Sequence, residues 1–288
     1  MVRKTTGSDV EPTPALEEIL DRCLTVLSSK PSGLATDIDG TISAIAPAPD
    51  AATVDPSARD ALKALTGQLD LVAVVTGRSA ADAERMLNLP DLVYVGNHGL
   101  ERRWRGTTRD QQAAQLSVQA IENALAETES ELQLRGISTG VLFENKRLSA
   151  SIHFRLSPAR DQIHDDVVAV AGAAAERHHL KLSEGRYVVE VRPNIAINKG
   201  TALLDLIEDR GLKGFIFLGD DVTDVDGFRV LREISSQGDV SAISVAVASP
   251  EARQFVLDEA DAVVANVSAA VDLLSLLASR LALDSNRS

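Results

Sequence analysis

The feature that most constrains the fold is an alternation of short apolar runs with helical segments at both ends of the chain. Near the N-terminus, helical patterns separate the strand-like runs GLATDID (33–39), LDLVAVVTG (69–77) and LVYVG (92–96). Near the C-terminus the same alternation returns through GFIFLGD (214–220) and ISVAVA (243–248). Apolar strands that alternate with helices are typical of a parallel sheet covered on both faces. Both end regions are therefore predicted to form one α/β domain.

The middle of the chain follows a different order. A long helical pattern at 111–132 precedes two strand-like runs, a second helical pattern and two more strand-like runs, at 140–146, 147–155, 161–177, 180–185 and 186–193. This order is typical of a compact α+β layer. We therefore expect a flexible tail at 1–16, a core domain formed by 17–105 and 195–288, and a second domain at 106–194 inserted between the two halves of the core.

The composition excludes several classes of protein. The 288 residues carry a net charge of -13, which opposes attraction to nucleic-acid phosphates. Cys23 is the only cysteine, so the chain forms neither an internal disulfide nor a thiolate zinc site. No apolar run approaches the roughly 20 residues of a membrane helix, and the N-terminal segment lacks the apolar centre of a signal peptide. We expect a soluble, cytoplasmic monomer with no nucleic-acid or membrane partner.

Acidic residues follow two of the predicted strands directly. Asp37 and Asp39 end the first run, and Asp220, Asp221 and Asp224 follow GFIFLG. Ligands of an open parallel sheet bind at the carboxyl ends of its strands. A surface turn or a helix cap accounts for one such acid but not for the whole set. Because gathered carboxylates repel one another unless a hard cation compensates them, the sequence predicts a Mg²⁺ site.

Residue types that bind phosphate occur at two further places. Thr76, Gly77 and Arg78 follow the second apolar run, and Lys199 opens a predicted helix. A hydroxyl, backbone amides and cations are the groups that hold a phosphoryl group. Taken singly, each residue has an ordinary structural interpretation as a helix cap or a surface charge. Their joint position beside the strand ends favours a phosphate site.

The order DxDGT, TGR, lysine and GDDxTD resembles the four motifs of the haloacid dehalogenase (HAD) superfamily of phosphotransferases. The resemblance implies a Rossmann-like parallel-sheet core with an inserted α+β cap domain of the C2B type. It also implies that Asp37 is the nucleophile, that Asp39 is the general acid and base, and that Thr76 and Lys199 bind the phosphate. The implied magnesium ligands are Asp37, the backbone carbonyl of Asp39 and Asp220, with Asp221 and Asp224 close by.

A narrower resemblance connects the chain with the trehalose 6-phosphate phosphatases. It rests on GNHGLE (96–101), ENKRLSASIHFR (144–155), GRYVVEVRP (185–193) and GDDVTDVDGF (219–228). The resemblance implies hydrolysis of trehalose 6-phosphate, with the cap closing over the sugar. The implied contacts are Glu144, Lys146 and Glu190 with sugar hydroxyls, Arg155 and Arg186 as basic cap residues facing the substrate, and Asn97 and His98 on the core side.

Two positions depart from the family pattern, and several alternatives stay open. Val225 stands where the family usually has an acid, and Asn198 replaces another polar residue before the lysine. The substrate could be a different glycosyl phosphate, such as sucrose 6-phosphate or mannosyl-3-phosphoglycerate, or the reaction could be that of a phosphomannomutase. The chain could also be a catalytically silent protein that binds a sugar phosphate. Kinase and dehydrogenase activities are disfavoured, because the sequence contains no GxxxxGK[ST] loop and no GxGxxG between a strand and a helix.

Overall fold

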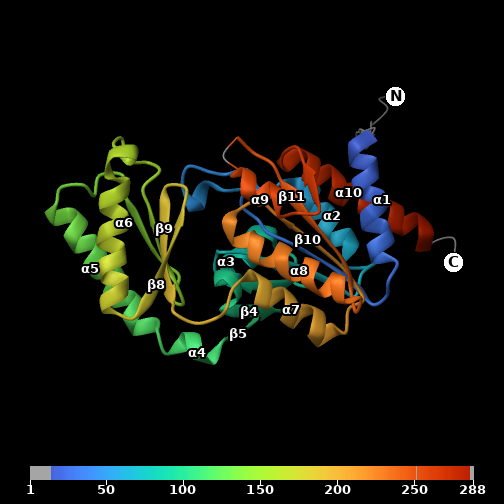
Figure 1. Ribbon diagram of the computed structural model, residues 1–288, viewed down its shortest axis with the longest axis horizontal. Helices are drawn as coiled ribbons and strands as arrows, with labels where there is room; N and C mark the ends of the chain where they lie inside the picture. Colours follow the sequence, from blue (N-terminus) through green and yellow to red (C-terminus); the bar gives the residue numbers. More distant parts are fainter. Residues whose placement is uncertain (1–13, 251, 286–288) are drawn as a thin grey trace, which may run out of the picture.

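The computed structural model describes residues 14–250 and 252–285, which form two lobes, each built on its own β-sheet (Figure 1). Most of the tail expected at 1–16 lies outside the described residues, and helix α1 begins at Pro14. None of the helices in the described ranges has the length and apolar character needed to cross a bilayer.

The larger lobe contains an eight-stranded sheet in the order β12-β11-β10-β1-β2-β3-β4-β5. Its strands are β1 (Ser32–Thr36), β2 (Leu71–Val75), β3 (Val93–Gly96), β4 (Glu101–Trp104), β5 (Thr107–Asp110), β10 (Gly214–Gly219), β11 (Ser241–Val247) and β12 (Ala262–Val264). Neighbours from β12 to β3 are parallel, and β3, β4 and β5 pair antiparallel. Because β1 pairs with both β2 and β10, the polar residues after these three strands lie at one edge of the sheet.

Helices cover both faces of this sheet. One face carries α1 (Pro14–Leu27), α2 (Pro56–Leu65), α3 (Ala80–Leu87) and α10 (Val267–Ser285), and the other carries α7 (Lys199–Arg210), α8 (Val225–Gln237) and α9 (Gln254–Asp258). Short 3-10 turns are η1 (Pro49–Ala51), η2 (Asn97–Gly99) and η3 (Val222–Asp224). Side chains of Ser79 and Asn198 cap the N-termini of α3 and α7, which fixes where these helices begin. The predicted α/β fold with a parallel sheet is confirmed.

The smaller lobe is a four-stranded antiparallel sheet in the order β6-β7-β9-β8. Its strands are β6 (Leu142–Asn145), β7 (Ala150–His153), β8 (Leu180–Gly185) and β9 (Val188–Pro193). Helices α5 (Val118–Leu134) and α6 (Arg160–Arg177) pack on the face turned away from the larger lobe (Figure 1). Ala150 and Ile152 belong to this packed face, so the alternating polar residues of β7 face the larger lobe.

The edge hairpin β4–β5 was not expected from the sequence. Its residues are mostly charged or polar and half-exposed, so the apolar signal of a buried strand is missing. Arg105 and Gly106 form a two-residue turn with φ of 47° and 76°, the positive values that favour tight hairpins. A domain boundary after residue 105 would divide this hairpin, so we propose a boundary that follows Asp110.

The prediction of a single helix at 111–132 is wrong, because the structure divides this segment into two helices. Helix α4 spans Gln112–Gln115 and α5 begins at Val118. Ala114 packs with Leu100 and Leu148 in a small cluster between the lobes, whereas α5 packs in the core of the smaller lobe. Two different packing surfaces therefore require two helices.

Candidate active site

A cleft of about 870 Å³ lies between the two lobes and is lined by residues of both. The larger lobe contributes the ends of β1, β2 and β10 and the segment 45–49, and the smaller lobe contributes the polar face of its sheet. The structure describes every predicted site residue, and all of them except Asn97 and Asp224 line this cleft. The cleft therefore contains a candidate active site whose two halves come from different lobes.

Lys199 lies at the floor of the cleft between two carboxylates. Its Nζ is 3.0 Å from Oδ2 of Asp37 and 2.7 Å from Oδ1 of Asp224, and the residue is only 1% exposed. Burial opposes the charged form, but the two carboxylates outweigh it and raise the pKa of Lys199. The ammonium is therefore charged at neutral pH and can offset negative charge on a phosphoryl group beside Asp37.

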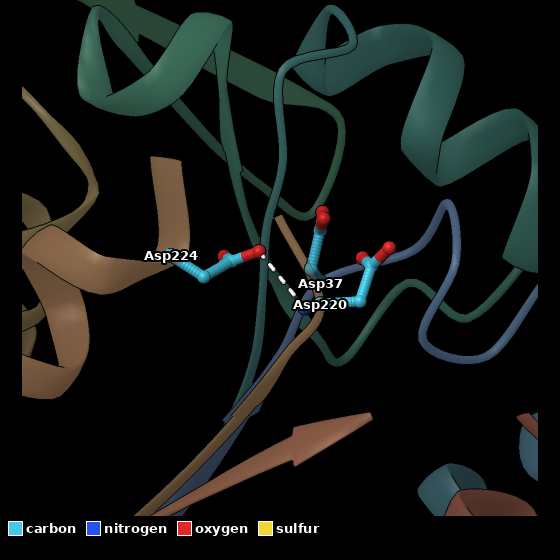
Figure 2. Close-up of side chains that lie close together, drawn as sticks. All are labelled: Asp37, Asp220 and Asp224. Carbon is cyan, nitrogen blue, oxygen red and sulfur yellow. Dashed lines mark hydrogen bonds between the residues drawn. The ribbon is translucent and has the colours of Figure 1, made fainter. Parts of the chain in front are cut away.

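Asp224 holds neighbouring groups in place. Besides Lys199, it accepts hydrogen bonds through Oδ2 from the backbone N–H groups of Asp220, at 3.1 Å, and Asp221, at 3.0 Å; Figure 2 shows the first of these. Burial, with a contribution from Asp37, raises the pKa of Asp224 to about 7 despite the nearby ammonium. Because both of its oxygens already accept hydrogen bonds, Asp224 orients the end of β10 and Lys199.

Asp220 is held beside Asp37 by the loop that follows β1. Thr41 Oγ1 donates to Oδ1 of Asp220 at 3.2 Å. Gly40 has a φ of 83°, and a Cβ at this position would lie 1.9 Å from Oδ2 of Asp220, so only glycine leaves room for the carboxyl group. Burial and the neighbouring acids, Asp37 first among them, raise the pKa of Asp220 well above its ordinary value. Thr41 and Gly40 therefore fix where the Asp220 carboxyl group lies beside Asp37.

The carboxylates fit a hard divalent cation. Among the described residues, Asp37, Asp220 and Asp224 offer oxygens that all lie within 4.8 Å of one another (Figure 2). Oδ1 of Asp37 is buried and accepts no hydrogen bond within the described part of the chain. An all-oxygen set with excess negative charge suits Mg²⁺. Asp221 is exposed and its carboxylate lies outside this group, so Asp37 and Asp220 are the acids best placed to bind an ion directly.

Asp39 makes a bidentate ion pair with Arg78. Arg78 Nε and Nη2 lie 2.6 Å and 2.8 Å from the two carboxylate oxygens of Asp39. The same guanidinium donates to Asp82 at 3.0 Å and to the carbonyl of Pro49 at 3.1 Å. Arg78 therefore positions Asp39 and the segment around Pro49, and its role in phosphate binding stays a prediction.

The backbone of residues 76–78, which we call the phosphate loop after the role predicted for it from the sequence, is held through all three of its carbonyls. The outer two accept hydrogen bonds from the backbone N–H groups of His98, at 2.9 Å, and Asn97, at 2.8 Å. The middle one, of Gly77, accepts from Nζ of Lys146 in the smaller lobe at 2.8 Å. The phosphate loop is thus fixed by both lobes.

Glu190 of the smaller lobe contacts the side chains of both Lys146 and His98. Its Oε1 is 2.5 Å from Nζ of Lys146, and its Oε2 is 2.8 Å from Nε2 of His98. Burial lowers the pKa of His98, so the neutral ring donates through Nε2. Despite burial, the charge of Lys146 and the hydrogen bond from His98 hold the pKa of Glu190 well below its ordinary value. Three predicted substrate contacts are therefore brought together into one network.

Asn97 does not reach the cleft. Its side chain is buried, donates to Glu101 Oε1 at 2.8 Å and accepts from Ser149 Oγ at 2.7 Å. Since Ser149 belongs to the smaller lobe, Asn97 joins the two lobes. The substrate contact predicted for Asn97 would require this side chain to give up these hydrogen bonds.

The remaining predicted cap residues lie farther along the cleft. Glu144 pairs with His153 at 2.9 Å, and this hydrogen bond with nearby cations lowers the pKa of Glu144 against the effect of burial. The guanidinium groups of Arg155 and Arg186 lie 5.4 Å and 5.6 Å from the centre of the Tyr187 ring. This end of the cleft therefore presents cations that favour an anionic or hydroxyl-rich ligand.

Among the cleft residues that sequence reasoning missed, three lie on the polar face of the smaller sheet close to the predicted ones. Ser151 and His153 stand on the polar face of β7, and Arg192 stands on β9 with Nε 3.6 Å from Oε2 of Glu190. The alternation of Ala150 and Ile152 with polar residues is a period-two signal that could have identified them. Which face of the sheet meets the other lobe was not available from that signal.

The fold has counterparts among solved structures. A domain of the C. albicans trehalose-6-phosphate phosphatase covers 94% of this chain and 99% of its own length with a TM-score of 0.74 and 20% identity. A haloacid dehalogenase-like hydrolase from Bacteroides thetaiotaomicron covers 88% of this chain and 100% of its own length with a TM-score of 0.52 and 14% identity. The fold is that of the haloacid dehalogenase-like hydrolases.

The sequence comparisons identify a family, which is more specific than the shared fold. Residues 35–261 match the family described as trehalose-phosphatase. A trehalose-phosphate phosphatase of Mycobacterium tuberculosis is 37% identical over 201 residues, which cover 68% of this chain and 50% of that protein. This chain belongs to the trehalose-phosphatase family. It spans about half the length of the curated relative.

Proposed function

We propose that this chain hydrolyses trehalose 6-phosphate to trehalose and phosphate through a phosphoaspartate on Asp37, as a step in the formation of trehalose. The observation that carries the proposal is the buried Asp37 beside the charged Lys199 at the floor of a cleft that a polar sheet closes; Oδ1 of Asp37 accepts no hydrogen bond from the described residues. Hydrolysis of a phosphate monoester is among the slowest uncatalysed reactions, so dividing it into two steps is effective catalysis.

In the first step, a carboxylate oxygen of Asp37 attacks phosphorus and the bond from phosphorus to the sugar oxygen breaks. Asp39 donates a proton to that oxygen, which releases trehalose. For this step the Asp39 side chain leaves its ion pair with Arg78, because both of its oxygens are engaged there. Lys199 offsets the negative charge of the phosphoryl group during transfer.

In the second step, water attacks phosphorus of the phosphoaspartate. Asp39 accepts a proton from that water, and the bond between phosphorus and Asp37 breaks. Phosphate leaves and the Asp37 carboxylate is restored. Asp39 thus serves as acid in one half of the reaction and as base in the other.

Asp37, Asp220 and the backbone carbonyl of Asp39 are the proposed holders of Mg²⁺. When bound, the ion would neutralise charge on the phosphoryl oxygens and on the surrounding acids. Asp224 supports the site through its hydrogen bonds to the backbone after β10. Val225 has a hydrocarbon side chain, so it supplies no further ligand at the position where the family pattern has an acid.

The polar sheet of the smaller lobe is proposed to select the sugar. Glu144 and Lys146 line the cleft, and both side chains can form hydrogen bonds with hydroxyl groups. Hydroxyl recognition by buried polar groups discriminates strongly, because an analogue without the hydroxyl leaves them unpaired. Arg155 and Arg186 are proposed to contact the substrate from the far end of the cleft. The reducing, cytoplasmic setting suggested by the single Cys23 stays part of the proposal.

The experiment is phosphate release in the presence of Mg²⁺ from trehalose 6-phosphate, sucrose 6-phosphate, glucose 6-phosphate and mannosyl-3-phosphoglycerate. We expect a preference for trehalose 6-phosphate and a loss of at least about 10³-fold in kcat for Asp37→Asn, because an amide cannot act as the nucleophile. Circular dichroism of the variant checks that the fold is retained.

A preference for another sugar phosphate would keep the mechanism and replace the substrate. If no phosphate is released from any of the four compounds but phosphate still binds to the cleft, the result would favour a sugar-phosphate-binding protein without catalytic activity. Full activity of Asp37→Asn would remove Asp37 from the nucleophilic role.

A further inference from the structure

The phosphate loop depends on the smaller lobe for one of its three backbone anchors. Two of its carbonyls are held by backbone N–H groups of its own lobe, whose positions follow from the sheet. The third, of Gly77, is held by the ammonium of Lys146, which follows β6 and reaches across the cleft at 2.8 Å. The central peptide of the loop is therefore anchored by a residue that belongs to the other lobe.

The same bond fixes the direction of the neighbouring N–H. In a trans peptide the C=O and N–H groups point in opposite directions. The carbonyl of Gly77 points to Lys146, and the N–H of Arg78 in the same peptide points to Thr76 Oγ1 at 3.3 Å. Because the Thr76 oxygen accepts this hydrogen bond, its own O–H is left to donate to a phosphate oxygen. Through this peptide, Lys146 thus acts on the hydroxyl that is predicted to bind the phosphate.

Lys146 is itself locked in place. Its side chain is 8% exposed, and Glu190 Oε1 lies 2.5 Å from Nζ. Glu190 also pairs with His98, and the His98 ring packs against Gly77 so closely that a Cβ there would lie 2.7 Å from two ring atoms. Glu190 therefore holds both groups that contact the middle of the phosphate loop.

We propose that Lys146 is a positioning residue of the phosphate site, in addition to any contact with the sugar. The smaller lobe completes the phosphate loop through Lys146, so affinity for the phosphoryl group depends on that lobe even when the ligand carries no sugar. The inference rests on the proposed function to the extent that the ligand is a phosphate ester. It adds that sugar recognition and phosphate binding share one side chain.

The test uses inorganic phosphate, which cannot report a sugar contact. Its dissociation constant is measured by calorimetry with Mg²⁺ for the wild type, Lys146→Met and Lys181→Met. Lys181 is the matched control, since it lines the same cleft from β8 but, within the described residues, makes no hydrogen bond to the phosphate loop. Lys146→Met is expected to weaken phosphate binding about tenfold or more through loss of a charge-assisted bond, and Lys181→Met less than about threefold.

Two further variants separate positioning from a general loss of structure. Lys146→Arg keeps a donor for the Gly77 carbonyl and should recover most of the phosphate affinity. Glu190→Gln keeps Lys146 but removes the carboxylate that holds it, and should give an intermediate loss. These two variants keep the inference testable if Lys146→Met does not fold.

The outcomes distinguish this inference from the proposed function. Wild-type phosphate affinity in Lys146→Met, combined with impaired turnover of trehalose 6-phosphate, would overturn the positioning role and leave a sugar contact alone. Equal losses in Lys146→Met and Lys181→Met would reduce the effect to general electrostatics and also overturn it. A wild type that binds phosphate, loses that affinity in Lys146→Met and hydrolyses none of the sugar phosphates would support the inference and overturn the proposed function.

Discussion

Charged side chains are buried in this cleft because each has a partner of opposite charge or a hydrogen bond. Lys199 lies between Asp37 and Asp224, and Glu190 lies between Lys146 and His98. Removing one partner of such a group typically costs about 3–5 kcal/mol, because the remaining charge stays buried. The two networks therefore contribute to stability as well as to the chemistry of the cleft.

The burial of His98 predicts a pH dependence of stability. Burial lowers the pKa of His98 from its ordinary value of 6.5, so below that pH the unfolded chain binds a proton that the folded chain does not. The free energy of unfolding should therefore fall as the pH drops below about 6.5, and this contribution should be fully present above that pH. Thermal unfolding between pH 5 and 8 measures it.

The matched variants are His98→Gln, which removes the titrating group, and His164→Gln, which changes a half-exposed histidine on α6. The melting temperature of His98→Gln should change less between pH 7 and 5.5 than that of the wild type, by a few degrees. His164→Gln should follow the wild type. Parallel curves for the wild type and His98→Gln would contradict the assignment.

Individual site residues could be predicted from the sequence where a reactive side chain occurred next to the end of a predicted strand or the start of a predicted helix. Asp37 and Asp220 follow strands, as their position after apolar runs suggested, and Lys199 opens helix α7; all three line the cleft. The pairing of Asp39 with Arg78 and the burial of Asn97 depend on side-chain geometry between loops, which no spacing in the sequence encodes.

At the scale of elements, the loop after β1 is shaped by one glycine. Gly40→Ala would place a Cβ 1.9 Å from Oδ2 of Asp220 at a φ of 83° and displace that carboxylate. We expect a loss of about 1–3 kcal/mol in stability and at least about a hundredfold in kcat/KM. Urea unfolding and phosphate release measure the two effects.

Gly136→Ala serves as the control for backbone strain alone. Gly136 has a φ of 70°, and a Cβ there would meet nothing within 4 Å. This variant should lose a similar amount of backbone stability with activity unchanged. If Gly40→Ala retained activity like Gly136→Ala, the proposed tight fit between Gly40 and Asp220 would be refuted.

Buried strands could be predicted from the sequence more readily than exposed ones. The buried strands β1, β2 and β10 are continuous apolar runs, so they could be identified directly. The hairpin β4–β5 lies at a solvent-exposed edge and has no such run. The break between α4 and α5 follows from contacts with two different clusters, which helical periodicity cannot indicate.

At the scale of the whole molecule, metal binding should link the two halves of the larger lobe. Asp37 follows β1 and Asp220 follows β10, so an ion between them binds only the folded chain. Mg²⁺ at about 100 times its dissociation constant should add about 2.7 kcal/mol and raise the melting temperature by several degrees. An excess of chelator should abolish both this shift and phosphate release.

Asp220→Asn is the matched variant for this experiment, because it keeps the shape of the side chain and removes a charged ligand. Its melting temperature should be insensitive to Mg²⁺. Unchanged activity of the wild type in excess chelator would reject the magnesium role. The monomeric state stays a prediction, and gel filtration against a mass of 30.6 kDa measures it.

The sequence by itself determined the α/β class of the larger lobe, the strands of its sheet and the chemical types gathered at their ends, because apolar runs and polar strand ends are local patterns. Only the tertiary structure decided that Lys146 reaches Gly77, that Glu190 pairs with His98, and that the polar face of the smaller sheet closes the cleft. These contacts join segments of two lobes. Their partners are set by how the two sheets pack, which no single segment of the chain specifies.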